Sequence, residues 1–306
     1  MVGLMKWQVL LFYKYVSIEN PQEYVENFRV LCEKHNLTGR ALIAEEGINA
    51  TLEGVTEDTE EFVKEWKQDV RFSDVQIKRS EGIGKSFKKL SVKFRNEIVG
   101  TKFPKEVDPR VKTAPHISAD ELHQMYENKE DFVVVDMRNS YEYASGHFAN
   151  SIDPGMNASR ELPEKLQNLR VYKDKKLVTV CTGGIRCEKM SAYLKHEGFE
   201  NVYQLDGGMH TYMEKYPEGH FKGTLFTFDE RMTMDFGGKR EIIGTCKLCG
   251  DKTEIYQNCS NAECNLLFLL CEKCTGDAGP VFCAPECKDK AVHIIDRIRR
   301  THEVRG

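Results

Sequence analysis

Hydrophobic and polar positions in the first hundred residues follow strand-like and helix-like periods in turn. The predicted elements, in chain order, are a strand over 7–16, a helix from Pro21 to about Asn36, strands over Arg40–Ala44 and Ile48–Glu53, a helix over 57–69, and strands over Val75–Arg79 and Leu90–Ile98. The order strand-helix-strand-strand-helix-strand is typical of a ferredoxin-like α+β module. We therefore predict a ferredoxin-like domain, with a basic, proline-containing linker, over residues 1–115.

From His116 onward, strands and helices alternate, which indicates an α/β domain with a mostly parallel sheet. The predicted elements are a helix over Ala119–Asn128 that Ser118 caps, a buried strand over Phe132–Val135, a strand over Lys176–Val180, a helix over Glu188–His196 and a strand over Asn201–Leu205. We assign this domain to residues 116–220. Residues 221–245 are predicted to be a linker to a cysteine-rich module over 246–306.

Composition narrows the class of protein. The chain has 306 residues, which suggests two or three domains, and its 40% hydrophobic and 30% charged residues are typical of a globular protein. No apolar run approaches the roughly 20 residues of a membrane helix. The short apolar run near the N-terminus lies between Lys6 and Lys14 and has no small-residue cleavage site. We therefore expect no membrane association and a reducing, cytoplasmic location.

The net charge of −4 conceals two basic segments. Between Lys78 and Lys112 there are eleven Lys or Arg residues against four acidic residues, and between Lys288 and Arg305 there are six against three. Such segments indicate a polyanionic partner, although a solvated lysine-rich face explains them equally well. The candidate contacts to the phosphates of such a partner are Lys85, Lys88, Lys89, Lys93 and Arg95.

Cys181 lies at the junction between a predicted strand and a predicted helix. The turn between them consists of Thr182, Gly183, Gly184, Ile185 and Arg186. Backbone N–H groups and the positive end of a helix dipole converge at such a turn, and they stabilise a thiolate. Thiol pKa values fall from about 8.5 to roughly 3.5–7.5 in these environments. We predict that Cys181 is a catalytic nucleophile in an active-site loop rather than a structural thiol.

Two neighbours of Cys181 have more than one interpretation. Arg186 is predicted to act in the loop, either by bonding turn carbonyls or by binding an anion, and a plain surface charge is the alternative. Cys187 falls at helical spacing with Met190 and Leu194, which favours a core-facing thiol over a second redox cysteine.

Eight cysteines near the C-terminus form four pairs. They are Cys246 and Cys249, Cys259 and Cys264, Cys271 and Cys274, and Cys283 and Cys287. Eight thiolates at these spacings suffice for two tetrahedral zinc ions, which we expect to be structural because so short a module has few large apolar residues. Disulfides and an iron–sulfur cluster are the less favoured alternatives. Spacing leaves the pairing open, and we favour an interleaved arrangement.

Several motifs around Cys181 resemble rhodanese signatures. Asp136-Met137-Arg138, Glu142 and Gly146-His147 resemble the first signature, and Leu205–Gly208 resembles the second. Cys181 and Arg186 are five positions apart, as in single-domain rhodaneses, whereas related phosphatases have six. The resemblance implies a rhodanese fold. Asp136, Arg138, Glu142 and His147 are predicted to support the loop or the fold, with an acid–base role for His147 as the alternative.

A wider resemblance covers nearly the whole chain. Glu46–Thr51, the loop Cys181–Glu188, the bridge Phe228–Arg231 and the cysteine-rich end are similar to the rhodanese-containing oxygen-dependent tRNA uridine hydroxylases (the TrhO/YceA family). The resemblance implies an oxidoreductase that converts the wobble uridine of tRNA to 5-hydroxyuridine with molecular oxygen as co-substrate. It also implies that Cys181 is the essential cysteine. We expect the anticodon loop as the partner, and no motif for an organic cofactor is visible.

Two other functions are compatible with the same residues. A rhodanese-type sulfurtransferase would carry a persulfide on Cys181. The basic N-terminal segment and the cysteine module argue against this function, because they suggest a macromolecular substrate. A non-enzymatic RNA-binding protein that zinc stabilises would have a Cys181 of ordinary reactivity. Thiol alkylation measured against pH distinguishes this last alternative from the two enzymes.

Overall fold

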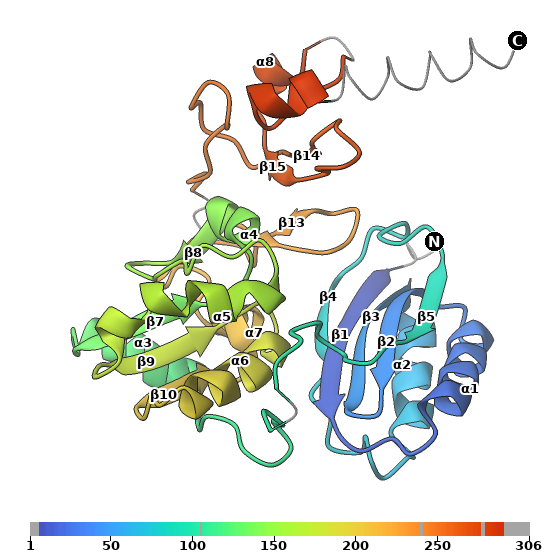
Figure 1. Ribbon diagram of the computed structural model, residues 1–306. Helices are drawn as coiled ribbons and strands as arrows, with labels where there is room; N and C mark the ends of the chain where they lie inside the picture. The colour runs from blue at the N-terminus through green and yellow to red at the C-terminus, as the bar shows by residue number, and fades with distance from the viewer. Residues whose placement is uncertain (1–5, 105, 239–240, 277–278, 291–306) are drawn as a thin grey trace, which may run out of the picture.

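The computed structural model describes residues 6–104, 106–238, 241–276 and 279–290. An N-terminal domain and a central domain lie side by side, and the cysteine-rich part of the chain extends beyond the central domain (Figure 1). Most of the second basic segment, from residue 291 onward, lies outside the described residues. Within the described ranges, no helix combines the length and the hydropathy that a bilayer crossing requires.

The N-terminal domain is a five-stranded sheet with two helices on one face. The strand order is β4-β1-β3-β2-β5, and all neighbours are antiparallel except β2 and β5. The elements are β1 (Trp7–Tyr15), α1 (Pro21–Lys34), β2 (Thr38–Ala44), β3 (Gly47–Val55), α2 (Thr56–Trp66), β4 (Lys78–Glu81) and β5 (Leu90–Phe94). The first four strands have the ferredoxin-like order, which confirms the predicted fold class, and β5 extends the sheet beside β2.

Two strand boundaries were predicted wrongly. The fourth strand begins at Lys78 rather than Val75, because Val75 follows a turn and contributes its buried side chain to the core without joining the ladder. The fifth strand ends at Phe94, and Ile98 packs in the core beyond the strand end. In both cases a buried hydrophobic residue next to a strand extends the alternating pattern without being part of the strand.

The sheet of the N-terminal domain has two different faces. Leu10 and Phe12 of β1 point toward α1 and α2, where Phe12 lies 4.6 Å from Trp66 between ring centroids. Leu11 and Tyr13, which alternate with them, face the central domain. Figure 1 shows both helices on the side of the sheet that is remote from the central domain. The period of two along a strand thus separates the core from the domain interface.

The central domain contains a four-stranded parallel sheet with helices on both faces. The strand order is β6-β10-β9-β7. The strands are β6 (His116–Ile117), β7 (Phe132–Asp136), β9 (Lys176–Val180) and β10 (Val202–Leu205). The helices are α3 (Ala119–Glu127), α4 (Ser140–Ser145), α5 (Leu162–Lys165), α6 (Ile185–His196) and α7 (Gly208–Lys215). Short 3-10 helices lie at Ser159–Glu161, Leu166–Asn168 and Arg170–Tyr172. This arrangement confirms the predicted parallel α/β domain. Ser118 and Glu121 form a capping box at α3, as the position of Ser118 predicts.

Separate hydrophobic clusters fill the two faces of the central sheet. Leu177 belongs to the cluster beneath α5 and α6, whereas the next residue, Val178, belongs to the cluster beneath α3 and α7. The strands are therefore buried on both sides, which explains their continuous apolar sequence. Helices α4 and α7 had no predicted counterpart, because both are short and α4 is rich in polar residues.

The residues after the central sheet first pack against it and then form the cysteine-rich part. The remaining strands pair as antiparallel neighbours: β8 (Gly146–Phe148) with β11 (Phe221–Gly223), β12 (Leu225–Phe226) with β13 (Thr233–Met234), and β14 (Tyr256–Asn258) with β15 (Leu267–Leu269), and α8 covers Glu272–Thr275. Tyr256 donates a hydrogen bond of 2.6 Å to the backbone oxygen of Tyr141 in α4. Its ring also packs edge-on against Phe226, and these contacts attach the cysteine-rich part to the central domain.

Candidate active site between the two domains

The loop that begins at Cys181 connects β9 to α6 in a tight ring. The backbone N–H of Gly184 lies 3.2 Å from the Cys181 sulfur, and the N–H of Cys187 also donates to it. Gly184 has a φ of +105°, and a Cβ at this position would lie 2.7 Å from the Tyr13 hydroxyl. A glycine is therefore required both by the backbone conformation and by the close approach of the N-terminal domain.

Helix α7 holds the outer side of this loop. The N–H of Met209 donates to the carbonyl oxygen of Cys181 at 2.9 Å, and the N–H of His210 donates to that of Thr182 at 3.0 Å. Gly208 brings the two segments together, because a Cβ there would lie 2.5 Å from the Cys181 oxygen. The loop carbonyls are thus engaged by α7, and N–H groups of the loop remain directed at the sulfur.

Arg186 is clamped inside the protein rather than left on its surface. Its guanidinium makes two hydrogen bonds to the fully buried carboxylate of Glu142, at 2.5 and 2.9 Å, and a third to the Thr182 hydroxyl at 3.1 Å. Paired groups of this kind keep their charge when buried. Glu142, for which the sequence predicts a supporting role, therefore fixes the positive charge beside Cys181.

The other residues of the first signature lie behind the loop. Arg138 is fully buried, pairs with Asp136 at 2.7 Å and donates to the carbonyl oxygen of Gly146 at 2.6 Å. His147 stacks on Tyr143, and its Nδ1 lies 2.9 Å from the Tyr143 carbonyl oxygen. Burial lowers the pKa of His147. None of these three is among the described residues that line the pocket containing Cys181.

The pKa of Cys181 reflects a competition between burial and positive charge. Burial alone would raise it, because a thiolate loses hydration. The thiol of Cys187, the guanidinium of Arg186 and the N–H groups of Cys187 and Gly184 outweigh burial and lower the pKa of Cys181 to about 6. Cys187 keeps its proton, because burial and the adjacent Cys181 thiolate raise its pKa well above the usual range. The pair thus consists of one thiolate and one thiol near neutral pH.

Cys181 forms part of the wall of a pocket between the two domains. The pocket has a volume of about 380 Å³, and its walls come mainly from the loop that begins at Cys181 and from the face of the N-terminal sheet that faces the central domain. Arg40, Asn49 and Thr51 contribute polar atoms from β2 and β3, and Phe87 and Phe228 contribute aromatic rings. The Cys181 sulfur is hidden from bulk solvent but borders this cavity, which is large enough for a flat, ring-shaped substrate.

Sequence reasoning missed most of the pocket walls. Nothing in the sequence around Arg40 distinguishes it from a surface residue of a strand. It reaches the pocket that contains Cys181 because β2 pairs with β3 in the folded sheet. Phe228 is 51% exposed, and the guanidinium of Arg186 lies 5.7 Å from its ring centroid. The one available signal was that Phe228 belongs to a conspicuous motif in the bridge after the central domain.

The basic residues predicted to bind RNA belong to a segment of the chain that also lines this pocket. Lys85, Lys88, Lys89, Lys93 and Arg95 are all exposed, and they belong to the chain segment that also supplies Phe87 to the pocket wall. Glu53, a buried carboxylate, accepts hydrogen bonds from the N–H groups of Ile83, Gly84 and Ser86 and from the Ser86 hydroxyl. This carboxylate fixes the loop that carries Lys85.

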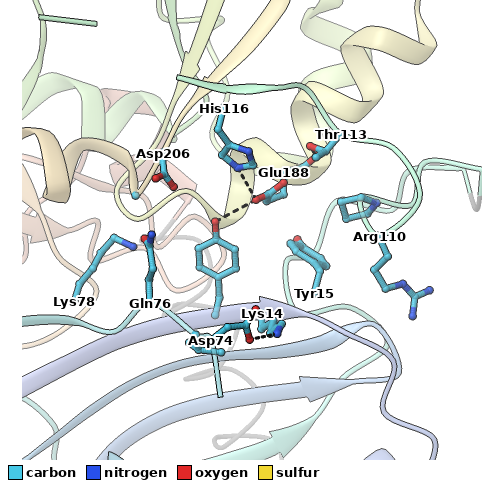
Figure 2. Close-up of a pocket in the computed structure, with 14 residues that line it drawn as sticks. Lys14, Tyr15, Asp74, Gln76, Lys78, Arg110, Thr113, His116, Glu188 and Asp206 are labelled. Atoms are coloured by element: carbon cyan, nitrogen blue, oxygen red, sulfur yellow. Dashed lines mark hydrogen bonds and ion pairs between the residues drawn. The ribbon is translucent and has the colours of Figure 1, made fainter. Parts of the chain in front are cut away.

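A second pocket, of about 360 Å³, shares Tyr13 with the first as a lining residue, and Figure 2 shows Glu188 and His116 in its wall. Glu188, the fourth residue of α6, is the centre of its hydrogen bonds. Its carboxylate accepts from Tyr13 at 3.4 Å and from Gln204 at 3.0 Å, and it lies 3.1 Å from His116. The hydrogen bond to Glu188 raises the pKa of His116. These contacts link the start of α6 to β1, β6 and β10.

Lys189 completes the attachment of α6 to the N-terminal domain. Its ammonium group lies 2.8 Å from Glu46 and 2.7 Å from Glu97, and its side chain is 5% exposed. Glu46 also accepts from the N–H of Ile98, and Glu97 accepts from Thr101 and Lys102. The buried lysine is therefore surrounded by partners that are themselves fixed, and it holds the two domains in one relative position.

The eight paired cysteines form two groups of four. Cys246, Cys249, Cys271 and Cys274 make one group, and Cys259, Cys264, Cys283 and Cys287 make the other. Sulfur–sulfur distances include 3.5 Å between Cys249 and Cys271 and 3.6 Å between Cys264 and Cys283. Each group has the four converging sulfurs of a tetrahedral metal site, and the pairs combine in the interleaved order favoured above.

The fold and this site define a protein of the rhodanese class with additional domains at both ends. Family models match as a UPF0176 acylphosphatase-like domain over residues 7–98, a rhodanese-like domain over 118–215 and a rhodanese C-terminal region over 222–288. The solution structure of a rhodanese-like domain from Anabaena sp. is similar to 42% of this chain and 94% of its own, with 19% identity and a TM-score of 0.32.

Relatives across nearly the whole chain identify the family. A protein of Staphylococcus carnosus named tRNA uridine(34) hydroxylase is 39% identical over 98% of this chain and 94% of its own length. A protein of the same name from Staphylococcus aureus strain MRSA252 is 42% identical over 88% of this chain and 86% of its own. The chain belongs to the tRNA uridine(34) hydroxylase family, which confirms the predicted relationship.

The lowered pKa of Cys181 predicts an unusual pH profile for its alkylation. Iodoacetamide should modify Cys181 with a midpoint near pH 6, and the rate should fall about tenfold per pH unit below it, because only the thiolate reacts. Mass spectrometry of the peptide that contains Cys181 measures the rate at each pH. Cys32, a buried thiol with a raised pKa, serves as the internal control and should stay unmodified in the folded protein. A Cys181 midpoint near the ordinary value of about 8.5 would contradict the assignment.

Proposed function

We propose that this protein hydroxylates the wobble uridine of tRNA at carbon 5, with molecular oxygen as the second substrate. One observation carries the proposal: a cysteine with a lowered pKa lines a cavity whose other walls belong to a neighbouring domain beside exposed basic residues. The relatives named tRNA uridine(34) hydroxylase support the same reaction. The reaction belongs in the cytoplasm, where tRNA is available.

In the proposed mechanism, Cys181 activates the uracil ring by a covalent bond. Its thiolate adds to carbon 6, and the added electron density makes carbon 5 an enolate-like carbon that reacts with oxygen. The developing negative charge on the carbonyl oxygen at carbon 4 requires hydrogen-bond donors within the pocket. Asn49 and Arg40 line the pocket and carry such donors. A well-placed donor of this kind contributes about 2.7–4 kcal/mol to the stabilisation of a transition state.

We infer that the anticodon loop lies over the opening between the two domains, with the wobble base turned into the pocket. Enzymes that act on a base remove it from its stack, and exposed aromatic rings then replace the lost stacking. Phe228 and Phe87 are suitably placed for that role, since both line the cavity that contains Cys181. Lys85, Lys88, Lys89, Lys93 and Arg95 would bind the phosphates on either side.

We further propose that each four-cysteine group binds one structural zinc ion. Four thiolates without a carboxylate or an open ligand position are the donor set that structural zinc prefers. The bound metal would stabilise a part of the chain whose core consists largely of the cysteines themselves. Its function would be to hold β14, β15 and the following residues against α4.

Replacing Cys181 with serine should abolish the modification. Serine keeps the size of the side chain but is not ionised near neutral pH, so no nucleophile would remain. The measurement is mass spectrometry of nucleosides from tRNA that lacks the modification, after incubation with either protein in air or under nitrogen. Wild-type protein should form 5-hydroxyuridine only in air. Thiosulfate-dependent sulfur transfer with unchanged tRNA would instead identify a sulfurtransferase.

Neutralising two lysines beside the pocket should weaken tRNA binding. For Lys88→Gln combined with Lys89→Gln, we expect a higher Kd and a salt dependence reduced by about 0.7 in log–log slope per lost phosphate contact. The matched control is Lys129→Gln combined with Lys175→Gln. Those lysines are also exposed, but they precede the starts of β7 and β9, whereas Cys181 follows the end of β9. Equal effects of the two pairs on Kd would refute the proposed binding surface.

Metal content should follow the two four-cysteine groups. Purified wild-type protein should contain two zinc ions per chain by elemental analysis, and Cys271→Ser and Cys283→Ser should each retain only one, because each leaves one complete group. Cys32→Ser, a substitution in the N-terminal core, should retain both. Iron with visible absorption, or disulfides without metal, would contradict the zinc assignment.

A further inference from the structure

Cys187 is held directly against Cys181 although it lies outside the pocket. Its thiol and its backbone N–H both interact with the Cys181 sulfur and favour the thiolate there. Both cysteines are fully buried and belong to one hydrophobic cluster of the central domain. Cys181 borders the cavity, whereas Cys187 is absent from the described residues that line it. A substrate in the cavity would therefore contact the first sulfur, and the second would lie behind it.

The proposed reaction has an electron requirement that these two thiols match. Transfer of one oxygen atom from O₂ to carbon 5 leaves a second oxygen atom, which becomes water only if two electrons and two protons are supplied. Two thiols supply both when they are oxidised to a disulfide. Cys32 lies in the core of the N-terminal domain, and the remaining eight cysteines form the two four-cysteine groups. Cys187 is thus the one cysteine placed to react with Cys181.

We propose that Cys187 is the resolving thiol of this site, and that Cys181 and Cys187 together supply the two electrons of each turnover as they form a disulfide. This inference rests on the proposed hydroxylation. Its starting point is a hydroperoxide at carbon 5 of the uracil, formed when the activated ring has reacted with O₂. Water then takes the proton from carbon 5, the electron pair of that C–H bond forms the double bond between carbons 5 and 6, and the bond between Cys181 and carbon 6 breaks, so the Cys181 thiolate is free again.

Two further steps complete the reaction. The Cys181 thiolate attacks the terminal peroxide oxygen, so an S–O bond forms and the O–O bond breaks. The uracil oxygen then takes a proton from water to give 5-hydroxyuridine, and Cys181 becomes a sulfenic acid. Cys187 next attacks the Cys181 sulfur, so the S–S bond forms and the S–O bond breaks. The hydroxide that leaves takes up the Cys187 proton and becomes water. A cellular thiol reductant regenerates the two thiols.

The charges around the pair favour this order of events. Before the reaction, the negative charge of Cys181 helps to keep the proton on Cys187. Once the Cys181 sulfur carries a hydroxyl group, that negative charge is gone, while the positive charge of Arg186 remains beside both sulfurs. Oxidation of Cys181 therefore removes one of the causes that raise the pKa of Cys187, although burial remains, and leaves Arg186, which lowers that pKa, in place when a nucleophile is needed.

The test is a turnover experiment without external reductant. Reduced wild-type protein, desalted under nitrogen, is mixed with unmodified tRNA in aerated buffer, and 5-hydroxyuridine is counted per chain. We expect no more than one product per chain, together with a peptide in which Cys181 and Cys187 are crosslinked. Dithiothreitol should restore repeated turnover. Cys187→Ser and Cys187→Ala should also stop after one product, but with Cys181 as a sulfenic acid that dimedone labels. Cys32→Ser should behave like the wild type.

Each other outcome counts against the proposal in a distinct way. Many products per chain without reductant would mean that the electrons come from elsewhere. Product without the crosslinked peptide would exclude Cys187 as the resolving thiol and leave the hydroxylation itself intact. An unlabelled Cys181 in both Cys187 variants, with product formed as in the wild type, would lead to the same conclusion. Absence of 5-hydroxyuridine in every sample, with dithiothreitol included, would overturn the hydroxylation and this inference together.

Discussion

The arrangement of the whole site depends on the first turn of α6. Four consecutive residues there contact different parts of the protein: Arg186 pairs with Glu142, Cys187 contacts Cys181, Glu188 accepts from Tyr13, and Lys189 lies between Glu46 and Glu97. Successive side chains of a helix point about 100° apart, so the side chains of one turn extend in all directions around the helix axis. The thiolate, its counter-charge and the domain interface are consequently fixed by a single rigid element.

Most of these contacts are between charged groups that have little access to water. Such pairs contribute little net stability, because the loss of hydration offsets much of their attraction. Removing one partner is far more costly, since the other charge is then buried alone. Glu142 and Lys189 illustrate the point, because both are enclosed by groups that are hydrogen-bonded in their turn. The network therefore specifies one geometry for the site more than it adds to the free energy of folding.

The sequence was informative where chemistry is local and uninformative where it depends on tertiary contacts. Cys181 and its loop were predictable because strand, glycine turn and helix follow one another within a few residues, and the cysteine pairs were predictable from their spacing. Arg40 and Phe228 were not, because nothing in their own surroundings indicates that they meet opposite the loop. The strand start predicted at Val75 is wrong for the same reason. The hydrophobic pattern shows that Val75 is buried, but it does not show whether the backbone pairs with a neighbouring strand.

The alternation along the N-terminal sheet has a consequence for how this family can change. On three adjacent strands, the residues that line the cavity (Leu11, Tyr13, Arg40, Leu42, Asn49 and Thr51) are interleaved with residues of the hydrophobic core. Substitution of a cavity-facing residue leaves the layer beneath the helices untouched, so substrate preference can drift while folding is conserved. Insertion of one residue would exchange the two sets at once. Replacement of a cavity-facing residue therefore alters the cavity without altering the core, whereas a change in strand length alters both.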